Sequence, residues 1–469
     1  MPTLRPTSSL LRTCRCLLTA LGLLAIAGPA AAQIALPGLP QLPGGGLSRF
    51  GDTGLRDRLR ERLLDTAELP RKVALDQLRV LTANDLLQRH PAQLERDPSG
   101  FPIVRREILA WSPSAAGLAA ASAAGLVVAG KREMPEVGQT LVTFRVPDGV
   151  STADALSALR AADPDGVYDF DHIYIGADSA TGGPAPVAPS AQAATTAQPK
   201  AIAPAAARLV TGGAGATGAA GGDMRVGLVD SGVDARHEVF ENARIVRWGC
   251  GDVARPAPHG TAVGALMIGK SERFSGAAPG AKLFAADIYC DQPTGGSASQ
   301  IVQALAWLAK EQVGVINISL VGPPNQMLGR VVQAMVARGH LLVAAVGNDG
   351  PNAAPLYPAS YPGVVGVTGV DPKRHPLPEA ARGPQVMFAA PGSQMAAAAI
   401  GTPPYKLVRG TSFASPLVAA LLALKLPSPS PALATEAVSA LAASATSAGD
   451  GTGRGVVGEN LRIPPSAFR

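Results

Sequence analysis

Three polar residues, each within two residues of a glycine at the edge of an apolar run, have the side chains that nucleophilic hydrolysis requires. Asp230 follows an apolar run and opens the turn Asp-Ser-Gly. His259 precedes Gly-Thr and a run of small residues that suits a helix packed closely on a sheet. Ser412 lies in Gly-Thr-Ser-Phe-Ala-Ser-Pro, before another apolar helix. Taken singly, such residues are more often turn formers or helix caps, so only their combination indicates a site.

The chemistry explains why these three residue types belong together. A serine hydroxyl is a poor nucleophile at neutral pH, so His259 would take the proton of Ser412 during attack and return it to the leaving amine. Asp230 would hold the imidazole in the useful tautomer and stabilise the imidazolium. The combination therefore predicts acyl transfer.

The elements that must position these residues are predicted by apolar runs that alternate with helical segments. The runs cover residues 225–229, 282–288, 313–319, 341–346 and 364–367. Such alternation indicates an α/β domain with a mostly parallel sheet flanked by helices. Asp230 follows the first of these strands directly.

The chain order Asp, His, Ser, at glycine-bearing junctions of an α/β sheet, is the order of the subtilisin triad. Over residues 222–460 the sequence resembles the subtilase family (peptidase S8). The resemblance is carried by Val-Asp-Ser-Gly-Val-Asp from Val229, His-Gly-Thr from His259, Asn-Ile-Ser-Leu from Asn317, Val-Gly-Asn-Asp-Gly from Val346 and Gly-Thr-Ser-Phe-Ala-Ser-Pro from Gly410. It implies a subtilisin-like fold and a serine endopeptidase with the catalytic residues Asp230, His259 and Ser412.

The resemblance also assigns residues around the bond to be cleaved. The Asn348 amide and the backbone N–H of Ser412 would form the oxyanion hole, although Gly-Asn-Asp-Gly is also an ordinary turn sequence. Ser319, Leu320 and Gly347 would bind the substrate by pairing with its backbone as an extra strand.

Some positions depart from the family pattern. Ala262 and Leu417 stand where many members have further histidines, but neither position belongs to the triad. After Leu320 the sequence Val-Gly-Pro-Pro replaces the usual Gly-Gly, so the substrate preference is not predicted. Calcium sites are common in the family, yet no dense Asp/Asn loop is evident. No metal or other cofactor is therefore predicted.

Residues 1–32 have the pattern of a secretory signal peptide. Three arginines precede the apolar run 16–27, and Ala-Ala-Ala precedes Gln33. The alternative is a membrane anchor, but the run is shorter than the ~20 residues of a spanning helix and no second run follows. We expect cleavage after Ala32 and export, to the periplasm or the medium, with no membrane span left.

Removal of this segment would leave Cys250 and Cys290 as the cysteines of the mature chain. An oxidising compartment permits a disulfide between them, but their spacing does not prove one. The alternative is two buried free thiols. No Cys-x-x-Cys or His-rich cluster indicates a metal.

The rest of the chain divides by composition. Residues 33–100 are predicted to form an N-terminal helical pro-segment with an amphipathic helix at 55–69, and residues 101–176 a small α+β ferredoxin-like domain of order β-α-β-β-α-β. An Ala/Pro/Gly linker follows at 177–206, and the catalytic domain spans 207–469. In element order the first half resembles the propeptides that assist and inhibit such proteases. The alternative is an independent domain that is kept.

Charge gives little support to other partners. The net charge is +6, but the basic residues are scattered and aromatic residues are not interleaved with them, so no nucleic-acid partner is predicted. We expect a monomer whose partners are a protein or peptide substrate and its own pro-region. The predicted function is a secreted serine endopeptidase made as a self-inhibited precursor. The alternative is a catalytically silent, exported peptide-binding or scaffold module.

Overall fold

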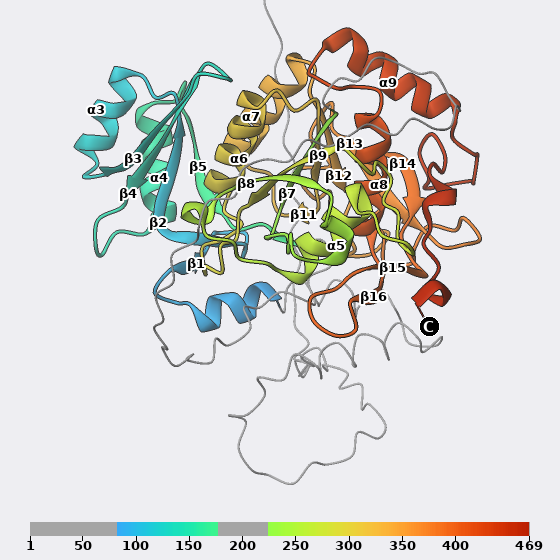
Figure 1. Cartoon of the computed structure of the whole chain (residues 1–469). Coiled ribbons are helices and arrows are strands. Elements are labelled where there is room, and N and C mark those ends of the chain that lie inside the picture. Colours follow the sequence, from blue (N-terminus) through green and yellow to red (C-terminus); the bar gives the residue numbers. More distant parts are fainter. Residues whose placement is uncertain (1–81, 177–223, 469) are drawn as a thin grey trace, which may run out of the picture. The chain divides into compact units, whose positions relative to one another are not determined.

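A computed structural model describes residues 82–176 and 224–468 (Figure 1). The predicted signal peptide, the amphipathic helix at 55–69 and the predicted linker at 177–206 lie outside the described residues. Within those ranges, no helix combines the length and the apolar character needed to cross a membrane.

A seven-stranded sheet dominates the described residues after 224, and all its neighbouring strands are parallel. The strand order is β14-β13-β12-β10-β7-β9-β8. The strands are β7 (Arg225–Asp230), β8 (Arg244–Trp248), β9 (Lys282–Asp287), β10 (Val315–Ile318), β12 (Leu341–Ala345), β13 (Val365–Val370) and β14 (Val386–Pro391). The predicted mostly parallel sheet is confirmed, and it also contains two strands, β8 and β14, that were not predicted.

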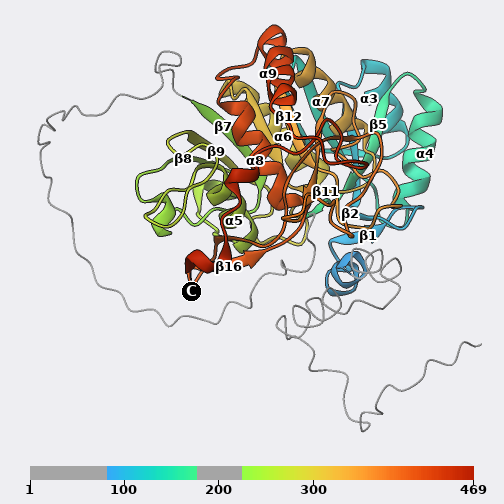
Figure 2. The same ribbon diagram turned by 90° about the vertical axis from the view of Figure 1, so that its right-hand side faces the viewer.

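Helices cover both faces of this sheet (Figures 1 and 2). They are α5 (Pro258–Ile268), α6 (Ala298–Lys310), α7 (Gln326–Ala337), α8 (Thr411–Ala423) and α9 (Pro431–Ala443). Alternate residues of β10 show the division: Val315 packs in the core that contains α5 and α8, whereas Ile316 and Ile318 pack in the core that contains α6 and α7. Burial on both faces explains why these strands are continuously apolar.

One helix begins earlier than its sequence suggests. The apolar helix predicted to follow the serine motif starts at Thr411, so Ser412 is its second residue rather than a preceding cap, and Gly410 is the N-cap. Pro416 lies inside the helix and has no N–H to donate to Ser412. The Ser412 carbonyl instead accepts a hydrogen bond from Ser319 Oγ at 3.1 Å, which lets the helix pass through the proline.

The described residues before 177 form an α+β unit with a sheet of its own. After a helical segment at 82–89 come β1 (Leu94–Arg96), β2 (Pro102–Trp111), α3 (Ala115–Ala123), β3 (Val127–Met134), β4 (Gln139–Arg145), α4 (Thr152–Ala162) and β5 (Val167–His172). The strands form a five-stranded antiparallel sheet in which β1-β2-β4-β3 are neighbours and β5 also pairs with β2. From β2 onwards the element order is the expected β-α-β-β-α-β.

The chain continues from β5 into a further short strand, β6 (Ile175–Gly176), which leaves the antiparallel sheet and pairs with β11 (Leu320–Val321). A separate hairpin is made by β15 (Met395–Ala398) and β16 (Tyr405–Val408). Short 3₁₀ turns lie at Glu238–Phe240, Cys250–Asp252, Glu459–Leu461 and Pro465–Phe468.

Two aspartates of β5 cap helices of the larger unit. Asp171 accepts hydrogen bonds from Ser299 N at 2.9 Å and Ser299 Oγ at 2.6 Å, in the first turn of α6. Asp169 accepts one from Gln326 N, the first residue of α7, at 2.7 Å. Carboxylates at helix N-termini satisfy N–H groups that have no partner inside the helix and complement the helix dipole. These contacts join the two units.

The contact at Asp171 is expected to depend on pH. Burial, assisted by the charge of Glu107, raises the pKa of Asp171 to about 6, while the Ser299 hydrogen bonds and His172 act in the opposite direction. The buried carboxyl binds its proton more tightly than a solvated carboxyl does, so protonation of Asp171 stabilises the folded state. This contribution to the free energy of unfolding is complete below about pH 4 and is lost as the pH rises through 6.

We therefore expect Asp171→Asn, which cannot ionise, to remove this dependence. In full-length Ser412→Ala protein, the free energy of unfolding relative to the Asp171→Asn double variant should fall by about 3 kcal/mol between pH 3 and pH 7. Urea unfolding at each pH measures the difference, and other titrating groups cancel in the comparison. Parallel pH profiles for the two proteins would contradict the assignment.

Candidate active site

The three predicted catalytic residues come from three different elements. Asp230 is the last residue of β7, His259 is the second residue of α5, and Ser412 is the second residue of α8. His259 Nδ1 lies 2.8 Å from Asp230 Oδ1 and 2.9 Å from Oδ2. The His259 ring contacts that of Phe413, next to Ser412, with 5.5 Å between the centroids. The histidine therefore lies between the aspartate and the serine turn.

The hydrogen bonds around Asp230 orient its carboxyl group and fix the histidine. The carboxylate is buried, and its Oδ1 accepts hydrogen bonds from Ser231 N at 2.6 Å and Ser231 Oγ at 3.0 Å. With such an acceptor beside it, Nδ1 of His259 carries the proton and Nε2 has the lone pair. Nε2 is the atom that a general base needs.

Close backbone packing brings α5 to the aspartate. Gly260 N donates to Ser231 Oγ at 3.0 Å, so the residue after the histidine is tied to the residue after the aspartate. A Cβ at Gly260 would lie 2.0 Å from the Ser231 carbonyl oxygen. Only glycine fits there, which explains why a glycine follows His259 in the sequence.

Buried polar groups form hydrogen bonds with the first turns of α8, the helix that carries Ser412. Ser319 Oγ donates to the Ser412 carbonyl, lies 3.0 Å from Ser415 Oγ and accepts from Asn317 Nδ2 at 2.8 Å. Ser319 was predicted to bind substrate, yet it is almost fully buried. Its side chain supports the nucleophile, so any contact of Ser319 with a substrate would come from its backbone.

The other two predicted substrate-binding residues lie in different surroundings. Leu320 is the first residue of β11 and pairs with Gly176 of β6 in antiparallel register. Gly347 has a φ of 101° and its carbonyl accepts from Ala381 N at 3.0 Å. The positive φ turns the chain out of β12 and directs it to Asn348.

Asn348 is oriented by the serine turn. Its Oδ1 accepts a hydrogen bond from Thr411 N at 3.1 Å, one residue before Ser412. This contact fixes which end of the amide is the oxygen, so the NH₂ end, which can donate, points away from Thr411 N. Asn348 and Ser412 are thus brought together through Thr411.

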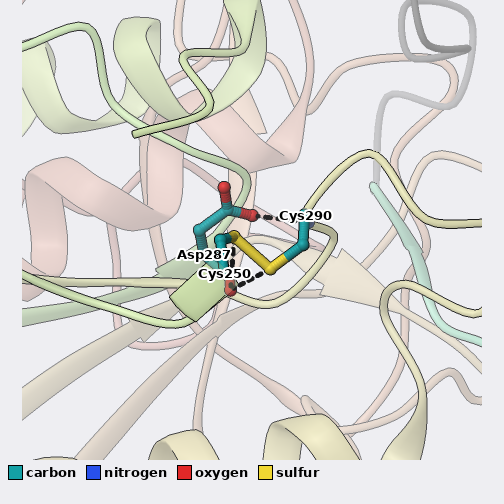
Figure 3. Close-up of side chains that lie close together, drawn as sticks. All are labelled: Cys250, Asp287 and Cys290. Carbon is teal, nitrogen blue, oxygen red and sulfur yellow. Dashed lines mark hydrogen bonds between the residues drawn. A yellow bond between two sulfur atoms is a disulfide. The ribbon is translucent and has the colours of Figure 1, made fainter. Parts of the chain in front are cut away.

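Cys250 and Cys290 form a disulfide in the structure, with the carboxyl group of Asp287 beside it (Figure 3). These three residues are the one group of potential metal ligands with suitable spacing among the described residues. Sulfurs bonded to each other offer no thiolates, and calcium prefers six to eight oxygen ligands. The group does not fit a calcium ion. Burial raises the pKa of Asp287, whose Oδ1 accepts from the backbone N–H of Tyr289 and Cys290.

Several contributing residues were not predicted. Ser231 and Phe413 adjoin catalytic candidates in sequence, and that proximity was the available signal. Glu379 and Arg409 pair with each other near the serine turn, but they are far apart in sequence and no motif links them.

A parallel α/β sheet that presents Asp, His and Ser in this order, from one strand end and two helix starts, is the arrangement of serine peptidases of the subtilisin kind. The chain belongs to the subtilase family, Peptidase_S8, whose family model matches residues 221–458.

The sequence is also similar to those of individual subtilisins. Subtilisin E of Bacillus subtilis (strain 168) is 31% identical over 218 residues, which are 45% of this chain and 57% of that protein. Subtilisin-like protease 1 of Trichophyton rubrum is 35% identical over 218 residues, 44% of this chain and 42% of that protein. The alignments thus span about half the length of these relatives.

A solved structure shows the same fold. Fervidolysin from Fervidobacterium pennivorans, described as a keratinolytic enzyme related to subtilisin, superposes with a TM-score of 0.58 at 18% identity. The match covers 79% of this chain and 63% of that one. The subtilisin-like fold expected from the sequence is confirmed.

Proposed function

We propose that this protein is a serine endopeptidase that cleaves peptide bonds through an acyl-enzyme on Ser412. The observation that carries the proposal is the hydrogen-bonded Asp230–His259 pair beside the serine turn, with Asn348 bound to the same turn. Membership of the subtilase family supports it.

The proposed reaction has two stages. His259 Nε2 takes the Ser412 hydroxyl proton while Oγ bonds to the substrate carbonyl carbon, and the carbonyl oxygen becomes an oxyanion. The Asn348 NH₂ and the Ser412 backbone N–H donate to that oxygen. The C–N bond then breaks as His259 protonates the leaving amine. In the second stage His259 deprotonates a water molecule, which attacks the ester. His259 then returns the proton to Ser412 Oγ as the acid product leaves.

The contacts of β6 support the proposal that the protein is made as a self-inhibited precursor. Ile175 and Gly176 pair with Val321 and Leu320 in the way that an extended peptide adds a strand to an exposed edge. Just before them, Tyr174 is fully buried and its hydroxyl donates to the Pro323 carbonyl at 2.7 Å.

Further bonds hold the same segment. Tyr174 N donates to the Gly296 carbonyl at 2.8 Å, and Tyr289 Oη donates to the Tyr174 carbonyl at 3.2 Å. Residues 174–176 therefore lie between the chain near Gly296 and β11, where we propose that the backbone of a substrate lies. The N-terminal unit then acts as a pro-region that occupies this proposed substrate site until it is removed, and the signal-like residues 1–32 direct export.

Labelling with a fluorophosphonate tests the enzymatic proposal. We expect Ser412 to react once the N-terminal unit is gone, since the reagent needs an activated serine and an oxyanion hole. Peptide mapping of the labelled protein identifies the site. A mature protein that binds peptides but leaves Ser412 unlabelled would favour the alternative, a silent peptide-binding module.

A further inference from the structure

A buried carboxylate lies close to the candidate oxyanion hole without belonging to the triad. The Glu379 side chain is 3% exposed and accepts two hydrogen bonds from Arg409, from Nε to Oε1 at 2.6 Å and from Nη2 to Oε2 at 2.9 Å. The Arg409 side chain is 33% exposed. Two parallel bonds between a guanidinium and a carboxylate define both the distance and the relative orientation of the two groups.

Arg409 forms the base of the nucleophile turn. It directly precedes Gly410, which has a φ of 135° and donates its N–H to the Gly392 carbonyl at 2.8 Å. Thr411 and Ser412 then begin α8. Movement of the arginine backbone would therefore be transmitted to the first turn of the helix that carries the nucleophile.

Glu379 lies in the segment that holds the other donor. Its carbonyl accepts a hydrogen bond from Gly350 N at 2.8 Å, and Ala381 N donates to the Gly347 carbonyl at 3.0 Å. These two bonds hold the loop that contains Asn348 at both ends. The glutamate backbone thus belongs to the Asn348 loop and its side chain reaches the Ser412 turn.

We propose that Glu379 and Arg409 are positioning residues that fix the Asn348 amide relative to the Ser412 N–H, so that both donors face one oxyanion. The inference rests on the proposed endopeptidase function. The pair does not touch the substrate in this role. It complements the Thr411–Asn348 hydrogen bond, which joins the same two loops, and a small displacement of either loop would misalign the donors.

Charge gives a second reason for a pair rather than a single ion. A buried carboxylate without a partner is costly, and its negative charge would oppose an oxyanion that forms nearby. Arg409 compensates that charge, and Glu379 in turn compensates the arginine. Removing one partner is therefore expected to do more harm than removing both.

The test compares Glu379→Gln, Arg409→Gln and the double variant in the mature enzyme. For each single variant we expect kcat for a peptide substrate to fall about 10- to 100-fold with KM nearly unchanged, because the donors act on the transition state rather than on substrate binding. The double variant should retain more activity than either single variant. Asn348→Ala removes one of the two donors and should lower kcat about 10²- to 10³-fold, which is the largest effect expected from misplacing that donor.

A peptide aldehyde separates positioning from a purely structural role. Its adduct with a serine carries the oxyanion, so its inhibition constant should weaken by the same factor as kcat/KM in each variant. The matched control is the exposed ion pair of Arg374 and Glu459, 2.8 Å apart, where Glu459→Gln should change neither quantity. Thermal melting of every variant shows whether it is folded.

The outcomes are distinguishable. Wild-type protein that neither hydrolyses the peptide nor reacts with a fluorophosphonate would overturn the enzymatic function and the inference with it. An active wild type whose Glu379→Gln variant keeps its kcat and aldehyde affinity would overturn the positioning role alone. So would a variant whose lost activity follows a lowered melting temperature while the aldehyde affinity of the folded fraction is unchanged.

Discussion

Replacing Ser412 with alanine is expected to lower kcat about a million-fold, the loss found when subtilisin loses its serine. The reason is that the methyl side chain of the variant gives His259 no hydroxyl to deprotonate, so no acyl-enzyme forms. Hydrolysis of a peptide substrate by mature protein measures the effect. Ser439→Ala, a change on the exposed side of α9, is the matched control and should retain full activity.

The same variant tests self-processing of the precursor. Wild-type protein should lose the region before about residue 206, whereas Ser412→Ala protein should keep it, and N-terminal sequencing of both shows the difference. Equal processing would mean that another protease makes the cut. A Ser412→Ala enzyme within a hundredfold of wild-type kcat would show that the serine is not the nucleophile.

Removing the disulfide is expected to lower the free energy of unfolding by about 4 kcal/mol. Cys250 and Cys290 are separated by 40 residues, and a cross-link over such a loop removes that much chain entropy from the unfolded state. The variant is Cys250→Ser with Cys290→Ser, made in the Ser412→Ala background to prevent self-digestion. Urea unfolding gives both the free energy and the m-value.

The folded state adds a functional consequence. Cys250 follows β8, and the chain then runs to α5 and His259, so the disulfide fixes the start of the segment that delivers the base. A dithiol reductant should destabilise the Ser412→Ala protein by the same amount and have no effect once both cysteines are serine. A destabilisation below about 1 kcal/mol would contradict the prediction.

The parallel sheet was predictable because its central strands are buried on both faces and are therefore continuously apolar. In β12 all five residues are buried, and the sequence shows this as an uninterrupted run. β8 was missed because it lies at the edge of the sheet, where Arg244 and Arg247 are exposed and interrupt the run. The central strands were therefore predicted from the apolar runs that burial on both faces produces, and not from strand propensity.

The candidate site was predictable where its chemistry lies in short motifs. Asp230, His259 and Ser412 each lie within a few residues of a glycine with a steric reason to be there, such as Gly260. The role of the Ser319 side chain was not predictable, because it depends on Pro416, which leaves the Ser412 carbonyl to accept its hydrogen bond from a residue far away in the sequence. Glu379 and Arg409 meet only after two loops have folded.

The all-parallel sheet also bears on how quickly the chain can reach its native state. Gly227 of β7 pairs with Ile316 of β10, so the central strands meet only after long loops have closed. Such non-local pairing is slow and leaves apolar strands exposed in the meantime. Asp171 and Asp169, which bind the starts of α6 and α7, would hold two helices of one layer in place and shorten that search. A chain deprived of residues 82–176 should therefore refold more slowly and aggregate more readily.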